Sequence, residues 1–189
     1  LINHMPEEDL KVIGSRFLLD NCKLAYKARE EYSWGSEMPD SIFFEYVLPY
    51  ANLNEKRENW RNDFYYRFST VIKNATSAYH AVTILNNKMF EMVGVNYSTK
   101  RPKADQAPYE SMDAGLASCT GLSILLIDAC RSIGVPARFV GTPMWYNNSG
   151  NHSWVEIWDN GWHVTGAAEP TGDELNNFWF SAIASRAVK

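Results

Sequence analysis

The 189-residue chain is poor in cysteine and carries no excess of basic charge. Its three cysteines, Cys22, Cys119 and Cys130, are an odd number without the paired spacing of a metal site, which argues against a disulfide framework. The net charge of −4 offers no general attraction to nucleic acid or to an anionic membrane surface. We therefore expect no nucleic-acid partner.

The sequence also lacks a signal peptide, a hydrophobic run long enough to cross a membrane, and any metal or nucleotide motif. We expect no cofactor, no metal ion and no membrane span. The chain begins at Leu1 and ends at Lys189 without an evident terminus, so we interpret it as a fragment of a longer protein whose further domains would be partners. The absent N-terminus leaves the compartment open and suggests a secreted or periplasmic protein.

The composition that remains is globular and rich in aromatic residues. Hydrophobic residues make up 46% and aromatic residues 14% of the chain, with seven tryptophans. At this length, residues 1–189 fit a single domain with a sizeable core. Such an aromatic content suits a core, and also a groove that holds an extended polymer such as a peptide or a glycan.

Helical patterns dominate the first part of the chain, about 1–97. One helix is expected from Pro6 to about Tyr26, and a short helix or turn over 39–49. Apolar residues at helical spacing predict a mostly helical segment over 59–93, divided near Asn74 and Ala75. Residues 95–114 lack periodicity and contain two prolines, so we expect a long loop there, of the kind that often serves function.

The second part, about 98–180, predicts one helix followed by strands. A small polar run up to Cys119 precedes a strongly apolar stretch that ends near Gly134, as expected for a buried helix with a glycine cap. Strands are expected over 137–141 and 152–158 and from Trp162 on, with a hairpin turn at Asn160-Gly161. The fold class is therefore α+β: a helical N-terminal half, then a catalytic-type helix packed on a small antiparallel sheet.

Cys119 and His152 together have the pattern of a nucleophile and its base. Unpaired backbone N–H groups and the positive end of the dipole at a helix start favour a thiolate at Cys119. His152 follows on a predicted strand, as a base for a thiol nucleophile would. Cys22 and Cys130 lie in apolar surroundings and are interpreted as structural thiols.

The hairpin offers a way to find an acid that orients the histidine. If Asn160-Gly161 is a two-residue turn, Trp158 opposes His163 and His152 opposes Glu169. Glu169 is then the candidate acid, although one bulge would change this register. An exposed loop acid is the alternative interpretation of Glu169.

From Ser118 to Pro170 these residues resemble the transglutaminase-like (papain-related) cysteine enzyme superfamily. The segments that carry the resemblance are Ser118–Gly121, Arg131–Arg138, Asn151–Glu156 and Gly161-Trp162. The N-terminal part resembles a bacterial subgroup through Ile42–Tyr50 and Trp60-Arg61. The resemblance implies a transglutaminase-like, papain-like fold, with Cys119 as nucleophile and His152 as base.

The resemblance also implies an orienting Asp about four residues after the tryptophan of the third strand. That position is Gly166 here, so either Glu169-Pro170 takes over the role after a shift or the triad is incomplete. Whether Glu169 completes the triad decides how much activity to expect.

We expect a cysteine-dependent acyl-transfer enzyme that works through a thioester, either an amide or peptide hydrolase or a transglutaminase-like transferase. Its substrate would be a peptide, protein or glycopeptide. Hydrolysis is favoured because no binding site for an amine acceptor is evident. Trp145, Tyr146 and Trp154 are expected near the site, lining a groove. Gln106 is a candidate oxyanion-hole side chain, with an ordinary polar loop residue as the alternative.

Two alternatives involve no catalysis. The domain would be a degenerate member of the same fold that binds a peptide or glycan, or a structural segment of a larger surface protein. The glycine at position 166 supports the degenerate domain, whereas the intact cysteine and histidine count against it.

Overall fold

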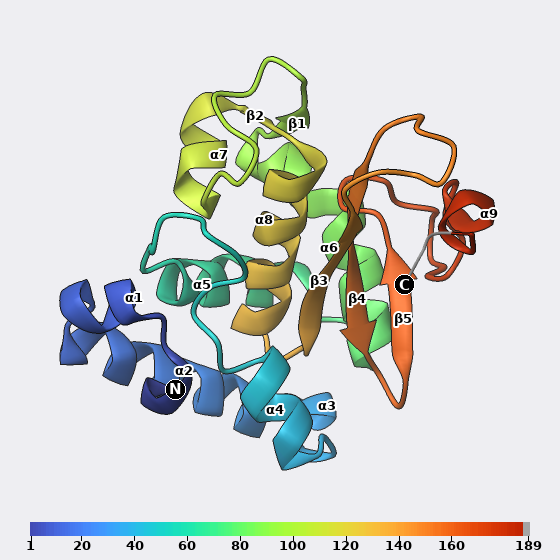
Figure 1. Cartoon of the computed structure of the whole chain (residues 1–189). Helices are drawn as coiled ribbons and strands as arrows, with labels where there is room; N and C mark the ends of the chain where they lie inside the picture. Colours follow the sequence, from blue (N-terminus) through green and yellow to red (C-terminus); the bar gives the residue numbers. More distant parts are fainter. Residues whose placement is uncertain (187–189) are drawn as a thin grey trace.

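Helices make up most of the N-terminal half in the computed structural model, which describes residues 1–186 (Figure 1). These helices are η1 (Ile2–His4), α1 (Glu7–Val12), α2 (Ser15–Glu31), α3 (Ser33–Ser36), α4 (Asp40–Tyr46), α5 (Arg61–Val71) and α6 (Ala78–Val93). The predicted division of the long helical segment near residue 74 is confirmed by the gap between α5 and α6. No helix within 1–186 is long and apolar enough to cross a membrane.

The helix predicted from residue 6 to about 26 is instead two helices, α1 and α2. Ile13 leaves the helical conformation, with φ −82° and ψ 119°, and Gly14 precedes α2 in an extended conformation. Glycine is a poor helix former, so a break there costs little. The turn also lets the buried Asp9 accept a hydrogen bond of 2.8 Å from the Tyr50 hydroxyl.

The long loop expected over 95–114 contains structure that the periodicity did not show. Two short strands, β1 (Asn96–Tyr97) and β2 (Leu116–Ala117), pair in parallel, and α7 (Pro108–Ala114) lies between them. Proline opens α7, and Gly115, with φ 65°, ends it. A helix of seven residues is too short for a periodic pattern, which is why the sequence did not reveal it.

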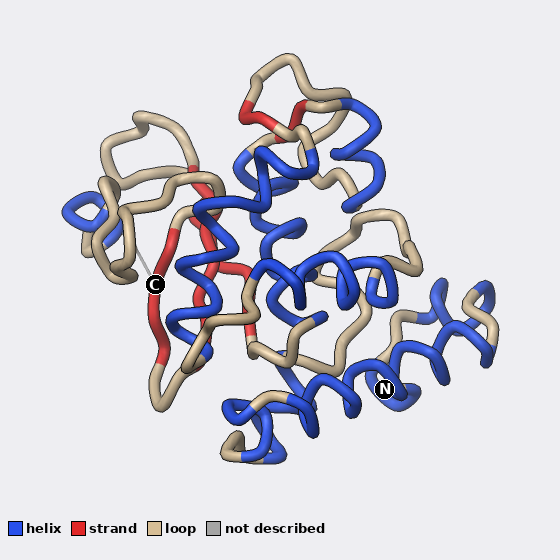
Figure 2. Tube along the Cα trace, turned by 180° about the vertical axis from the view of Figure 1, so that it is seen from behind, coloured by secondary structure: helices blue, strands red, loops and turns tan. Residues whose placement is uncertain are grey.

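The expected helix after Ser118 is α8 (Cys119–Ser132), and it packs on the predicted three-stranded sheet. The strands β3 (Ala137–Thr142), β4 (His152–Trp158) and β5 (Trp162–Thr165) are antiparallel in the order β3-β4-β5. One face of β4 enters the main core together with α6 and α8, which lie beside the sheet in Figures 1 and 2. The opposite face of β4 carries Trp154, which packs with Trp145 and Phe180 in an aromatic cluster separate from the main core.

The predicted hairpin register is wrong by one residue. Trp158 pairs with Trp162, not with His163, and the ladder ends at the pair Val155–Thr165. The turn therefore holds three residues, with Asn160 alone in the left-handed region at φ 55°. Because side chains alternate along a strand, a shift of one residue exchanges the two faces of β5. The predicted pairing of His152 with Glu169 across a continuous ladder consequently does not occur.

Two buried arginines fasten the N-terminal helices to α8. The Arg61 side chain donates to the Asn21 side chain at 2.7 Å and to the backbone carbonyl of Arg131 at 2.8 Å. Arg131 on α8 donates to the carbonyls of Tyr46 and Ala51. These hydrogen bonds fix the C-terminal half of the helix whose N-terminus carries Cys119.

Candidate active site

Cys119 is the first residue of α8, as the sequence predicted. The Ser118 side chain caps the helix by accepting a 3.1 Å hydrogen bond from the Gly121 N–H, and its hydroxyl donates to the Ala104 carbonyl. The N–H groups of the first helical turn have no acceptor within the helix. The cap therefore places a partly exposed thiol beside free backbone donors.

His152 begins β4 and lies next to the thiol. Its side chain is buried, with 7% of the residue exposed. Burial acts to raise the pKa of Cys119, but hydrogen bonding to His152 and Ser153 and the charge of the imidazole outweigh it, so the pKa of the thiol lies below its ordinary value. The predicted nucleophile and base are thus brought into contact.

Glu169 lies on the other side of the imidazole. Its Oε2 is 3.4 Å from His152 Nε2, an ion-pair contact, and neither atom has a hydrogen-bond partner among residues 1–186. Because Nε2 faces the carboxylate, Nδ1 is the ring nitrogen left for the thiol. Burial lowers the pKa of His152, but the neighbouring Cys119 and Glu169 raise it more, to about 9. The ring is consequently protonated at neutral pH.

The chain brings Glu169 to this place by a tight turn and not by a longer hairpin. After β5, the Glu169 N–H donates to the Gly166 carbonyl at 3.2 Å, and Ala168 adopts a left-handed φ of 60°. The turn reverses the chain within four residues and points the Glu169 carboxylate back towards β4. The predicted acid is therefore near the histidine, although the register used to predict it was wrong.

Asn86 on α6 holds this turn, a role for which no local sequence pattern is a signal. Its Nδ2 donates to the Thr165 hydroxyl at 2.9 Å and to the Gly166 carbonyl at 2.8 Å. Its Oδ1 accepts from the Ala168 N–H at 2.9 Å. A buried asparagine with both ends of its amide bonded fixes the backbone that carries the glutamate.

The three aromatic residues that we expected to line a groove do not line the cleft at Cys119. Trp145 and Trp154 are buried, and their rings lie 6.4 and 6.3 Å from the His152 ring, so they support the histidine from the core. Tyr146 is 49% exposed and its hydroxyl accepts a hydrogen bond from Arg186 at the outer edge. None of these three lines the cleft at Cys119, because they lie in or beside the aromatic cluster.

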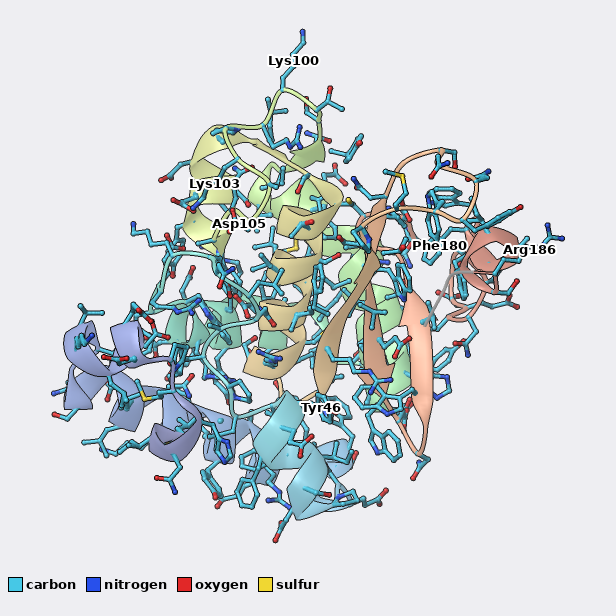
Figure 3. The ribbon with its side chains drawn as sticks, viewed as in Figure 1. Tyr46, Lys100, Lys103, Asp105, Phe180 and Arg186 are labelled. Atoms are coloured by element: carbon cyan, nitrogen blue, oxygen red, sulfur yellow. The ribbon has the colours of Figure 1, made fainter. Side chains whose placement is uncertain are left out.

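Two aromatic residues that the sequence reasoning missed also touch the histidine. The Phe180 ring is fully buried, 4.7 Å from the His152 ring, and lies between α9 (Ser181–Ala184) and the sheet in Figure 3. The neighbouring Trp179 ring is 5.1 Å from His152 and 67% exposed. The run of aromatic residues after Asn177 was the available signal, but nothing in it specified the histidine as partner.

Gln106 is buried and does not line the cleft at Cys119. Its Nε2 donates to the carbonyls of Leu116 and Glu110, at 3.0 and 3.3 Å, so both amide hydrogens are already used. The prediction that Gln106 is an oxyanion donor is therefore wrong. Gln106 is a buried residue that links the loop before α7 to β2 by a hydrogen bond. The backbone N–H groups at the start of α8 are the donors that remain.

A cleft of about 400 Å³ opens at Cys119, between the loop after β1 and the ends of β3 and β4. A larger hollow of about 880 Å³ lies among η1, α4 and the 48–57 segment, but it contains no part of the Cys119–His152–Glu169 constellation. Within residues 1–186, no group of three or more His, Cys, Asp or Glu side chains is arranged to hold a metal ion.

Comparison with known proteins identifies the fold and the family of the chain. Residues 67–167, more than half of the chain, match the family model of the transglutaminase-like superfamily. The fold is similar to the crystal structure of a "putative cysteine protease" from Cytophaga hutchinsonii, with a TM-score of 0.55 and 15% sequence identity over 74% of this chain. The chain spans 46% of the length of that protein. Curated protein sequences gave no significant match. The chain belongs to the transglutaminase-like superfamily.

Proposed function

We propose that this domain is a cysteine-dependent acyl-transfer enzyme that uses Cys119, His152 and Glu169. The observation that supports the proposal is that His152 neighbours both the Cys119 thiol and the Glu169 carboxylate, with Glu169 Oε2 3.4 Å from His152 Nε2. The lowered pKa of Cys119 and the raised pKa of His152, about 9, favour a thiolate–imidazolium pair. Such a pair is an activated nucleophile.

In the first step, the Cys119 thiolate attacks an amide carbonyl carbon and the carbonyl electron pair moves to oxygen. The resulting oxyanion lies at the start of α8, where a backbone N–H such as that of Cys119 would stabilise it by about 3 kcal/mol. The intermediate collapses, the C–N bond breaks, and the His152 imidazolium gives its proton to the leaving amine. A thioester remains on Cys119.

In the second step, His152 removes a proton from a nucleophile that attacks the thioester carbonyl carbon, and the C–S bond then breaks to release the Cys119 thiolate. Water yields a carboxylic acid and the free enzyme, whereas an amine yields a new amide. We favour water because it needs no binding site, and the name of the structurally similar protein, a putative cysteine protease, points the same way. The substrate class that fits is a peptide, protein or glycopeptide amide.

Thiol reactivity tests the proposal directly. Iodoacetamide at pH 6, followed by peptide mapping, should label Cys119 at least about tenfold faster than Cys22, since the neighbouring imidazole lowers the pKa of the Cys119 thiol. Cys130 is the internal control, because burial raises the pKa of its thiol. Cys119→Ala should remove the fast label. Equal rates at Cys119 and Cys22 would refute the activated thiol and support a degenerate binding domain.

A substrate screen separates the reactions. Casein-derived peptides are incubated with the domain and assayed for new amino termini, ammonia release and incorporation of a fluorescent amine. New termini that depend on Cys119 and His152 support peptide hydrolysis, and ammonia release without amine incorporation supports amide hydrolysis at side chains. Efficient amine incorporation would overturn the hydrolytic assignment in favour of transamidation.

A further inference from the structure

Among residues 1–186, the cleft at Cys119 is lined by a single charged side chain besides the thiol, and that side chain is a cation. Its lining residues come from the loop after β1, the start of α8 and the ends of β3 and β4. Arg101 is the charged member, and no acidic residue in the described part of the chain lines the cleft. The chain as a whole has a net charge of −4, so a cleft with an isolated positive charge is unlike the average surface.

Most N–H donors of the Arg101 guanidinium have no acceptor among residues 1–186. Its Nη1 donates to the Thr99 carbonyl at 2.7 Å, which fixes the side chain in the loop. Nε is covered and has no acceptor, and no carboxylate lies within ion-pair distance of the guanidinium in the part of the chain that the structure describes. The next cation, Lys103, is by contrast paired with Glu110 at 2.9 Å. Arg101 is thus held in place but not neutralised.

Activation of the thiol does not account for Arg101. The pKa of Cys119 is set by burial, by His152 and by Ser153. A guanidinium has five N–H donors in a planar fork that matches a carboxylate. An arginine that is placed in a cleft, unpaired and unused by the nucleophile is suited to a ligand.

We propose that Arg101 binds a free carboxylate of the acyl substrate, so that the domain prefers peptide amides that carry a carboxylate near the reacting bond. This inference rests on the proposed function for its substrate but concerns a different residue. Arg101 determines specificity and takes no part in bond making. The helix start at Cys119 adds to the positive potential of the cleft.

Binding to the Cys119→Ala protein tests the inference without turnover. N-acetyl-trialanine with a free C-terminal carboxylate and the same peptide as its carboxamide are titrated by NMR. The acid should bind about tenfold more tightly than the amide, and Arg101→Gln should remove the difference. Arg101→Lys, which keeps the charge but loses the planar fork, should retain part of it.

Lys100→Gln is the matched control, because Lys100 is the neighbouring cation on the same loop and points away from the molecule in Figure 3. This variant should keep the preference for the acid. Equal binding of acid and amide, binding of neither peptide, or an unchanged preference in Arg101→Gln would overturn the inference. Failure of the proposed function would appear separately, as loss of fast Cys119 alkylation, which does not depend on Arg101.

Discussion

The Glu169 carboxylate occupies the space that a side chain on Gly166 would fill. A Cβ added at Gly166 would lie 2.9 Å from both Cβ and Cδ of Glu169 and closer still to Oε2. The two residues are joined by an isolated β-bridge within one tight turn. A carboxylate thus approaches His152 from residue 169 at the place where the family resemblance expected one from residue 166.

Gly166→Ala should therefore disturb the site although it removes no functional group. The added methyl group collides with the Glu169 side chain and pushes the carboxylate away from His152. We expect kcat/KM, or the rate of Cys119 alkylation at pH 6, to fall at least about tenfold, as for other misplacements at reacting groups. Gly161→Ala is the matched control, since a Cβ there meets no atom within 4 Å. Equal rates in both variants would contradict the packing argument.

The same relationship predicts a rescue. Glu169→Ala removes the acid and should lower the activity strongly, whereas Gly166→Asp in that background supplies a shorter carboxylate from the vacated turn. The double variant should recover at least part of the loss, and Gly166→Asp alone should remain impaired because both side chains compete for one space. A double variant no better than Glu169→Ala would show that position 166 cannot direct an acid towards His152.

The sequence contains local signals for two residues of the candidate site, but not for the path of the chain that brings the third residue near them. Cys119 and His152 were recognisable because a helix start and a strand start each have local signals, namely a polar cap and an alternating pattern. The hairpin register that predicts Glu169 is wrong by one residue, but the tight turn after β5 still places the Glu169 carboxylate near His152. Asn86 was invisible because its role depends on the packing of α6 against a turn about 80 residues away.

Asn86 should act as a positioning residue. Asn86→Ala removes the acceptor of the Ala168 N–H and one of the donors to the Gly166 carbonyl, and a hydrogen-bonding group left without its partner costs about 1–3 kcal/mol. We expect a lower melting temperature and, in the folded protein, a lower pKa of His152 because Glu169 is held less firmly. Asn87→Ala is the control, since Asn87 bonds the Gly172 carbonyl and not this turn. If Asn86→Ala lowered the melting temperature but left the NMR titration of His152 unchanged, Asn86 would have a structural role only.

The fall of kcat/KM at high pH should report the loss of the proton from His152. His152 keeps its proton to a pKa of about 9, so the thiolate–imidazolium pair and with it kcat/KM should decline as the pH rises through 9. Glu169→Gln removes the negative charge that raises this pKa, so the upper limb should move to lower pH. The contribution of His152 to the free energy of unfolding has the same pH dependence. Because its pKa is raised from an ordinary 6.5 to about 9, this stabilisation is fully present below pH 6.5 and is lost as the pH rises through 9. An upper limb that stays in place in Glu169→Gln would separate Glu169 from the imidazole.

Arg61 should matter for stability and not for chemistry. Arg61→Met removes the donor to several buried acceptors, among them the Asn21 side chain and the Val47 carbonyl, and each buried acceptor left without a partner costs about 1–3 kcal/mol. We expect a much lower melting temperature, while Cys119 in the remaining folded protein is alkylated at the rate of the parent. Arg16→Ala, which removes an exposed pair with Asp20, should leave the melting temperature nearly unchanged because water and salt screen such a pair. If Arg61→Met slowed alkylation in protein shown by NMR to be folded, the anchor at the C-terminal half of α8 would also be required to place the nucleophile at its N-terminus.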